Sequence, residues 1–227
     1  MVIAIDGPAG TGKSTIAMML AENLQGKDGK PFTYINSGNL YRAITLGCLR
    51  LSIDPAEHEK VLEYAKTAPL QYRDGQLYLE EDMVEGFLHS DEVDKYVSPV
   101  SAIVPVRHVV NDLVRKIAAG LNAVVEGRDM TTVVFPNAEY RFYLDASIKE
   151  RAKRRFEQGV SRLSLEEIEQ SIEERDSIDR NKVEGRLYVG EGVIYLDTSG
   201  LTLNQVYDTL LKRLQTKDET DGSGNGH

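Results

Sequence analysis

The 227-residue chain has one cysteine, no tryptophan and no long apolar run, and its acidic residues outnumber its basic ones. The lone Cys48 can form no disulfide within the chain, which fits a reducing cytoplasm. The apolar run at 2–5 is too short for a signal peptide or a membrane span, and no later run approaches the required length. We therefore expect a cytoplasmic protein that has no membrane partner.

The charge balance restricts the class of ligand. Lys and Arg number 27 against 36 Asp and Glu, so the net charge is −9. Such a chain has no general electrostatic attraction for nucleic acid, and any anionic ligand must be held by a local group of basic residues. The length suits one domain. We expect a monomer with a single domain over 1–216 and, because residues 217–227 contain no apolar side chain, a disordered tail there.

Hydrophobic spacing predicts alternating strands and helices. Short apolar runs typical of buried parallel strands occur at 2–5, 32–35, 121–125, 140–144 and 193–196. Helical spacing occurs at 13–24, 38–51, 104–119, 147–158, 164–180 and 202–214. Ser164 and Glu167 form a capping box at one helix start. Asp74-Gly75 between two alternating segments predicts an antiparallel hairpin, which we interpret as an insertion into a parallel α/β core.

Between the first strand and the first helix lies a complete phosphate-loop motif, Gly7-Pro8-Ala9-Gly10-Thr11-Gly12-Lys13-Ser14. Its glycines let successive N–H groups point at phosphate oxygens, and the helix start adds the positive end of a dipole. Lys13 is expected to reach the β- and γ-phosphates of ATP, and the Ser14 hydroxyl to coordinate Mg²⁺. The loop and Thr15 are thus the predicted ATP site, although the motif identifies no reaction.

A carboxylate and a missing motif bear on the class of enzyme. Glu126 ends the 121–125 strand, where an acid can hold Mg²⁺ through water, and the alternative is a solvated loop acid. A GTPase would need Asn-Lys-x-Asp, but Asn181-Lys182 is followed by Val183-Glu184. A kinase for a small acceptor remains.

Such a kinase needs arginines around a second anion. Arg42, Arg107 and Arg128 stand at predicted helix starts or strand ends, where a guanidinium could hold an acceptor phosphate. Arg155 and Arg175 belong to the two charged helices and could cover the transferring group. The alternative for each is a pairing with nearby glutamates on a solvated face.

Several segments resemble those of bacterial cytidylate kinases, and the resemblance covers residues 2–213. The segments are Ser37-Gly38-x-x-Tyr41-Arg42, Val97-Ser98-x-x-Ser101-Ala102-x-x-x-Val106-Arg107, the run from Glu126-Gly127-Arg128-Asp129 to Pro136-Asn137-Ala138, Arg175-Asp-x-x-Asp179-Arg180 and Leu196-Asp197-Thr198-Ser199. The resemblance implies an α/β P-loop kinase with three αβα layers and a central parallel sheet. It also implies an antiparallel acceptor-binding insertion at about 67–103 and a helical lid at about 155–187.

The resemblance further implies Mg-ATP as donor and CMP or dCMP as acceptor. Arg128, Arg155 and Arg175 would join Lys13 as catalytic residues. Ser98, Arg107 and Asp129 would read the cytosine. The whole implied CMP site is Ser37, Tyr41, Arg42, Ser98, Arg107, Gly127, Arg128, Asp129, Arg175 and Asp179.

The chain also departs from the family pattern. Asn36 and Glu126 stand where Asp is usual, Thr131 where Gly is usual, and Lys182 where Arg is usual. Arg186 begins a segment that replaces a proline-containing run, and it is a candidate to compensate for Lys182. Two other functions stay open: a kinase for another monophosphate or metabolite, and a catalytically idle nucleotide-binding module.

Overall fold

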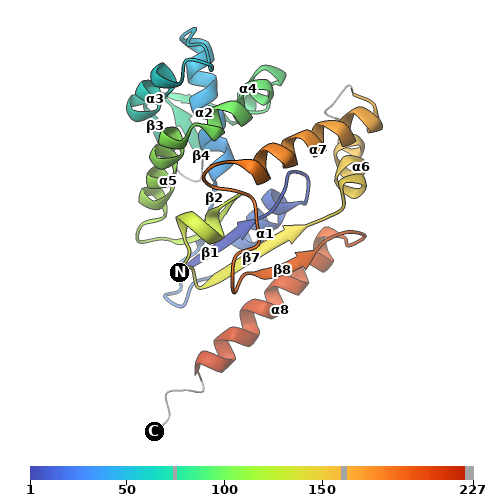
Figure 1. Ribbon diagram of the computed structural model, residues 1–227. Coiled ribbons are helices and arrows are strands. Elements are labelled where there is room, and N and C mark those ends of the chain that lie inside the picture. The colour runs from blue at the N-terminus through green and yellow to red at the C-terminus, as the bar shows by residue number, and fades with distance from the viewer. Residues whose placement is uncertain (74–75, 160–162, 223–227) are drawn as a thin grey trace.

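A computed structural model describes residues 1–73, 76–159 and 163–222, and its main sheet has five parallel strands in the order β2-β6-β1-β7-β8 (Figure 1). The strands are β1 (Val2–Asp6), β2 (Phe32–Asn36), β6 (Asn122–Gly127), β7 (Tyr140–Asp145) and β8 (Ile194–Asp197). Ile5 of the central strand pairs with Glu126 on one side and Phe142 on the other. The carboxyl ends of these strands therefore meet at one edge, where ligands of such sheets bind.

Helices cover both faces of this sheet. Ile3 and Ile5 pack with α1 (Lys13–Asn23) and α8 (Leu203–Gly222), whereas Ala4 packs with α2 (Ser37–Arg50) and α5 (Val104–Ala118). This alternation along β1 is the period of two that a strand requires when both of its faces are buried. The three-layer αβα prediction is confirmed.

The insertion is an antiparallel sheet flanked by helices. Strands β3 (Leu70–Arg73), β4 (Gln76–Leu79) and β5 (Asp82–Met83) pair in that order, and the predicted turn at 74–75 lies outside the described residues. The flanking elements are α3 (His58–Thr67), the short helical turn η1 (Glu85–Phe87) and α4 (Asp91–Ala102). We did not predict α4 from sequence. Ser90 caps the start of α4 by accepting a hydrogen bond from the Val93 N–H. Pro99 lies inside the helix.

Two charged helices, α6 (Ile148–Glu157) and α7 (Leu165–Asn181), pair beside the phosphate loop (Figure 1). The capping box at the start of α7 is confirmed, since Ser164 and Glu167 exchange both hydrogen bonds. Ala152, Ile168 and Ile172 form a small apolar cluster between the helices, separate from the two clusters on the sheet. Directly after β6, residues Met130–Val134 form a short helical segment, η2.

The C-terminal segment differs from the expectation of a disordered tail from residue 217. Helix α8 continues to Gly222, and residues 223–227 lie outside the described part of the chain. Adding a residue to an existing helix is much easier than starting one, so a polar sequence can extend α8. Among the described residues, none of the helices is both long and apolar enough to cross a membrane.

A buried arginine ties the α6–α7 pair to the phosphate loop. The Arg151 guanidinium donates two hydrogen bonds to Asp176 on α7, at 3.1 and 2.6 Å, and one to the Ala9 carbonyl at 3.1 Å. Its Nε donates to the Ala146 carbonyl at 2.9 Å. The residue is only 1% exposed. A charge at this depth is tolerable because nearly every donor has an acceptor.

We therefore expect Arg151→Met to lower the free energy of unfolding by about 3–5 kcal/mol, because it leaves the Asp176 carboxylate buried and unpaired. Denaturant unfolding measures this change. The control is Lys153→Met, since Lys153 is exposed and its ion pair with Glu157 is long, at 3.9 Å. The double variant Arg151→Met/Asp176→Leu should be more stable than Arg151→Met alone. Wild-type stability of Arg151→Met would contradict a structural role for this pair.

Candidate active site

The phosphate loop joins the central strand to α1 at the carboxyl edge of the sheet. Gly7 has a φ of +147°, and a Cβ there would lie 2.0 Å from the Leu144 carbonyl oxygen, so only glycine fits against β7. Gly12, with a φ of +87°, is the residue before α1. The N-terminus of α1 thus opens at the loop, as an anion site requires.

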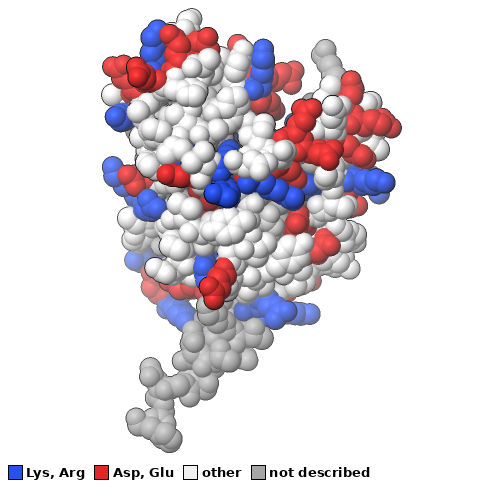
Figure 2. Space-filling view, in the orientation of Figure 1, with Lys and Arg blue, Asp and Glu red and all other residues white. Residues whose placement is uncertain are grey.

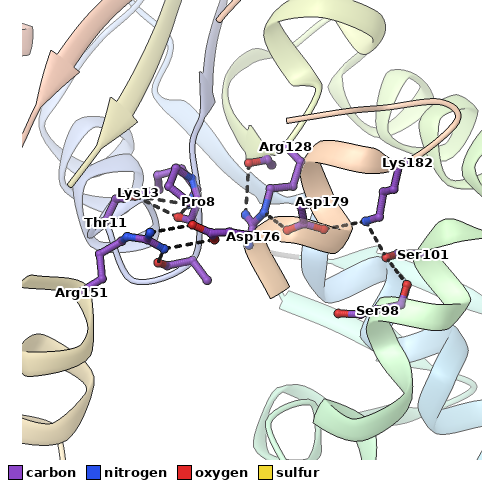
Figure 3. A network of polar contacts seen from close by, with 12 residues as sticks. Pro8, Thr11, Lys13, Ser98, Ser101, Arg128, Arg151, Asp176, Asp179 and Lys182 are labelled. Atoms are coloured by element: carbon purple, nitrogen blue, oxygen red, sulfur yellow. Dashed lines mark hydrogen bonds and ion pairs between the residues drawn. The ribbon is translucent and has the colours of Figure 1, made fainter. Parts of the chain in front are cut away.

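Lys13 lies folded over its own loop. Its Nζ donates to the Pro8 carbonyl at 2.6 Å and to the Thr11 hydroxyl at 3.4 Å (Figure 3). Burial, followed by the positive charge of Arg128, lowers the pKa of Lys13 to about 7. The ammonium is thus short of negative charge, which a bound phosphate would supply.

Next to the loop, Glu126 accepts hydrogen bonds at Oε1 from the Tyr34 hydroxyl at 2.5 Å and the Asn36 amide at 2.8 Å. Tyr34 also interacts with Ser14. Burial, and then the Glu126 charge, raises the pKa of Tyr34, which keeps it a neutral donor. The two departures at 36 and 126 are thus linked, because an amide at 36 can donate to the carboxylate at 126 and a second carboxylate could not.

This group fits a magnesium ion bound mainly through phosphate and water. Within the described residues, no three His, Cys, Asp or Glu side chains gather as a metal site. Mg²⁺ at kinase sites is held by one or two protein oxygens together with substrate phosphates. Ser14 and Glu126 offer such oxygens, and the Glu126 Oε2 accepts no hydrogen bond from the described residues.

A cavity, which we call the acceptor cavity, lies between the phosphate-loop edge of the sheet, the insertion and α7. Its lining residues are Asn36, Ser37, Gly38, Tyr41, Arg42, Val97, Ser98, Ser101, Arg107, Glu126, Gly127, Arg128, Arg175, Asp179 and Lys182. Every predicted acceptor residue except Asp129 lines this acceptor cavity. We did not predict Lys182 or Ser101 as site residues.

Four arginines line the acceptor cavity, namely Arg42, Arg107, Arg128 and Arg175. Arg42 donates to the Leu88 carbonyl and to Asp94, both at 2.7 Å. Arg175 has a buried Nε that finds no hydrogen-bond partner among the described residues. Burial, then the charge of Arg128, lowers the pKa of Arg175 to about 10. An uncompensated guanidinium next to another is the arrangement expected of an anion site.

Helix α7 supplies one aspartate to each half of the site (Figure 3). Asp176 bonds Arg151 at the phosphate loop, whereas Asp179, one turn later, accepts from Arg128 at 2.8 Å and from Lys182 at 2.7 Å. Although burial alone would raise it, Arg128 and Lys182 hold the pKa of Asp179 well below its usual range. Lys182 also donates to the Ser101 hydroxyl at 3.0 Å.

At the far wall of the acceptor cavity, Arg107 donates to Asp129 at 2.6 Å and to the Ser101 carbonyl at 2.9 Å. Both side chains are almost fully buried. The Arg107 guanidinium also lies over the Tyr41 ring, 5.5 Å from its centroid. Asp129 lies behind Arg107 and lines a different cavity.

Arg155 and Arg186 lie away from this wall. Arg155 is half-buried at the end of α6, and its Nη2 lies 3.9 Å from Asp94, the partner of Arg42. It therefore connects the lid helices to the insertion without lining the acceptor cavity. Arg186 lines the cavity behind Asp129, so it does not take the place of Lys182 in this structure.

Asp6 is a buried residue that the sequence analysis missed. Its carboxylate accepts from the Met130 N–H at 2.9 Å, the Thr131 N–H at 2.7 Å and the Thr131 hydroxyl at 2.6 Å. The last residue before the phosphate loop thereby holds the start of η2, directly after Arg128 and Asp129. Burial, despite these hydrogen bonds, raises the pKa of Asp6 to about 6.

Comparisons with known proteins agree over the full domain. A family model described as cytidylate kinase matches residues 3–216. A protein named cytidylate kinase from Caldanaerobacter subterraneus subsp. tengcongensis is 39% identical over 222 residues, which cover 96% of each chain. One of the same name from Borrelia turicatae is 40% identical, covering 96% of this chain and 97% of its own.

A solved structure of an uncharacterized protein from Eubacterium ventriosum shares the fold. Its TM-score is 0.51 at 12% identity, over 95% of this chain and 98% of that chain.

The burial and contacts of Asp6 predict that its carboxyl group titrates at a weakly acidic pH in the folded protein. The folded-state pKa lies above the ordinary 3.8, so the contribution of Asp6 to stability is full below pH 3.8 and is lost as the pH rises through about 6. Thr131→Val removes a hydroxyl that favours the ionised form, and it should raise the Asp6 pKa further. Carbon-13 NMR of the Asp6 carboxyl measures both values. An unshifted pKa in Thr131→Val, with the Thr132→Val control also unshifted, would contradict the hydroxyl contact.

Proposed function

The chain belongs to the cytidylate kinase family, whose members are nucleoside monophosphate kinases, and we propose that it transfers the γ-phosphoryl group of Mg-ATP to CMP or dCMP. The observation that carries this proposal is the position of Arg128. Its guanidinium lines the acceptor cavity, and its charge lowers the pKa of Lys13 in the phosphate loop. One arginine is therefore close to both predicted phosphates, as in-line transfer between them requires.

Phosphoryl transfer between two phosphates needs little covalent assistance. The acceptor phosphate is already an anion, so we assign no general base and no nucleophilic side chain. Mg²⁺ would neutralise charge between the donor phosphates, held there by Ser14 and, through water, Glu126. Lys13, Arg128 and Arg175 supply the remaining positive charge to the transferring group.

The acceptor would lie across the cavity with its phosphate toward Arg42, Arg128 and Ser37. Arg175 and Asp179 are proposed to hold the sugar hydroxyls, and Asp179 must then exchange part of its bonding to Arg128 for the ligand. Asn36 is already committed: its amide donates to Glu126 and its oxygen accepts from the Asn39 N–H. We therefore assign sugar contact to α7 instead of to Asn36.

We propose that α6 and α7 form a lid that closes over ATP, with Arg155 as the cation that moves farthest. Its long contact with Asp94 gives it a half-exposed resting position from which a phosphate could attract it. Closure would exclude water, to which the phosphoryl group would otherwise be transferred.

The low pKa of Lys13 predicts proton uptake when ATP binds. At about pH 8 the ammonium of the empty site is mostly deprotonated, and a phosphate would restore its charge. Calorimetric titration with Mg-ATP in buffers of different ionisation enthalpy should therefore show uptake that Lys13→Met abolishes together with turnover. Lys116→Met, at an exposed lysine on α5, is the control. Uptake that persists in Lys13→Met would assign it to another group.

The residues Ser98, Arg107 and Asp129 predict that the acceptor base is cytosine. The cytosine N4 amino group is a donor where uracil has an acceptor, so a carboxylate near that edge favours CMP. Ser98 and Arg107 would donate to the ring acceptors. Asp129, which holds Arg107 from behind, would accept from the amino group once the ligand is bound. Because mismatched analogues leave buried polar groups unpaired, we expect kcat/KM for CMP to exceed that for UMP by at least about a hundredfold.

Asp129→Ala should lower kcat/KM for CMP far more than it lowers the affinity for ATP. It should also reduce the ratio of kcat/KM for CMP to that for UMP. The matched control, Asp112→Ala, removes an exposed aspartate of α5 that pairs with Arg115 on the same helix. Coupled ADP release with CMP, dCMP, UMP and AMP is the measurement. Full CMP preference in Asp129→Ala would show that Asp129 reads nothing, and a wild-type preference for UMP or AMP would overturn the proposed acceptor.

A further inference from the structure

Behind the Arg107–Asp129 pair lies a second, larger cavity of about 620 Å³, which we call the rear cavity. It is bounded by α5, by η2 and by the segment that follows α7. Its volume lies within the range of small-molecule sites. The two cavities share Arg107 alone, and none of the remaining rear lining residues belongs to the acceptor cavity.

The segment after α7 is fixed at the mouth of the rear cavity. Glu184 bonds the His108 ring at 2.7 Å, which fastens the segment to α5. Gly185 has a φ of +66°, and a Cβ there would lie 2.0 Å from the Arg107 Nη2. The Leu187 N–H donates to the Asp179 carbonyl at 2.9 Å, and the Leu187 side chain is buried. The rear cavity therefore has walls held in place on several sides.

The unsatisfied side chain of Asn111 is the first observation that points to a ligand in the rear cavity. It lies one turn after Arg107 on α5, lines the rear cavity and is only 4% exposed. Its Oδ1 is fully buried, and the side-chain amide makes no hydrogen bond with the described residues. An amide oxygen buried without a hydrogen-bond donor is costly, because it loses its bonds to water. A ligand that bonds this amide would remove the cost.

The charges at the rear cavity favour an anion. Its two carboxylates are already occupied, since Asp129 is bonded to Arg107 and Glu184 to His108. Arg180 and Arg186 have no carboxylate partner within the described residues. Figure 2 shows Lys and Arg side chains gathered across the middle of this face, near the end of α7. Two free guanidinium groups suit a phosphate.

The remaining lining is apolar and partly aromatic. Tyr188 is 52% exposed, and Val133 and Val183 also present exposed side chains next to the rear cavity. A half-exposed tyrosine ring beside an unsatisfied amide suits a flat heterocycle, which can pack on the ring and bond the amide through its polar edge.

We propose that the rear cavity binds a second nucleoside phosphate, with its phosphate between Arg180 and Arg186 and its base on Tyr188 beside the Asn111 amide. This site is separate from the phosphate loop and from the acceptor cavity. It makes no use of Lys13, Arg42 or Arg128.

Amide NMR with CTP as the probe tests this site while a cytidine–adenosine pentaphosphate fills the phosphate loop and the acceptor cavity. We expect CTP to shift the amide signals of Asn111, Gly185 and Tyr188 with a dissociation constant below about 1 mM. Shifts confined to the phosphate loop, or none at that concentration, would overturn the proposal. If the pentaphosphate does not bind, the proposed function fails, but the positions of the CTP shifts still decide whether the rear cavity is a site.

Matched variants and ligand fragments sharpen the test. Arg180→Gln/Arg186→Gln and Asn111→Leu should each weaken CTP at the rear cavity by at least about tenfold, whereas Lys116→Gln/Lys153→Gln, which removes the same charge elsewhere, should not. If the control pair weakened CTP binding equally, the effect would be one of net charge, and the proposed site would be overturned. Cytidine and inorganic tripolyphosphate should each bind more weakly than CTP, and tripolyphosphate as tight as CTP would overturn the base contact.

Discussion

The site depends on how one helix neutralises positive charge that is packed into a largely buried cleft. Arg128, Arg175 and Lys182 line the same cleft, and like charges at such depth repel strongly. Asp179 lies between Arg128 and Lys182, and Asp176, one turn earlier, pairs with Arg151 beneath the phosphate loop. The two carboxylates on one face of α7 let the cationic cleft exist in the folded, empty protein. They also connect the phosphate-loop half of the site to the acceptor half through one helix.

Features specified by short segments could be predicted from the sequence. The phosphate loop follows from eight consecutive residues, and the capping box at Ser164 from four. The strands of the sheet are visible because buried parallel strands are continuously apolar. The acceptor residues were placed by the family resemblance. All of them except Asp129 line one cavity in the structure, and Asp129 is bonded to Arg107 behind it. In each of these cases the local sequence agrees with the global fold.

The remaining features rest on contacts between distant segments. Asp6 bonds Thr131, and nothing next to Asp6 in the sequence signals that it will be buried against η2. Arg151 looks like one of many charges on a solvated helix until Asp176 and Ala9 surround it. Helix α4, which carries Ser98, has helical spacing at Val93, Val97 and Val100, but Pro99 in its interior is unfavourable to a helix. Asn36 and Glu126 look like two separate departures in the sequence, yet they form one hydrogen-bonded unit in the fold.

The Asp179 carboxylate gives the empty cleft an internal competitor for any entering ligand. A carboxylate carries a single negative charge and is already desolvated and positioned between two cations. A neutral nucleoside offers Arg128 nothing in exchange, and a monoanion offers no more charge than Asp179 already does. A phosphate dianion carries twice that charge and more acceptor oxygens, so it can draw Arg128 away. The aspartate should therefore weaken the binding of monoanions more than that of phosphate dianions.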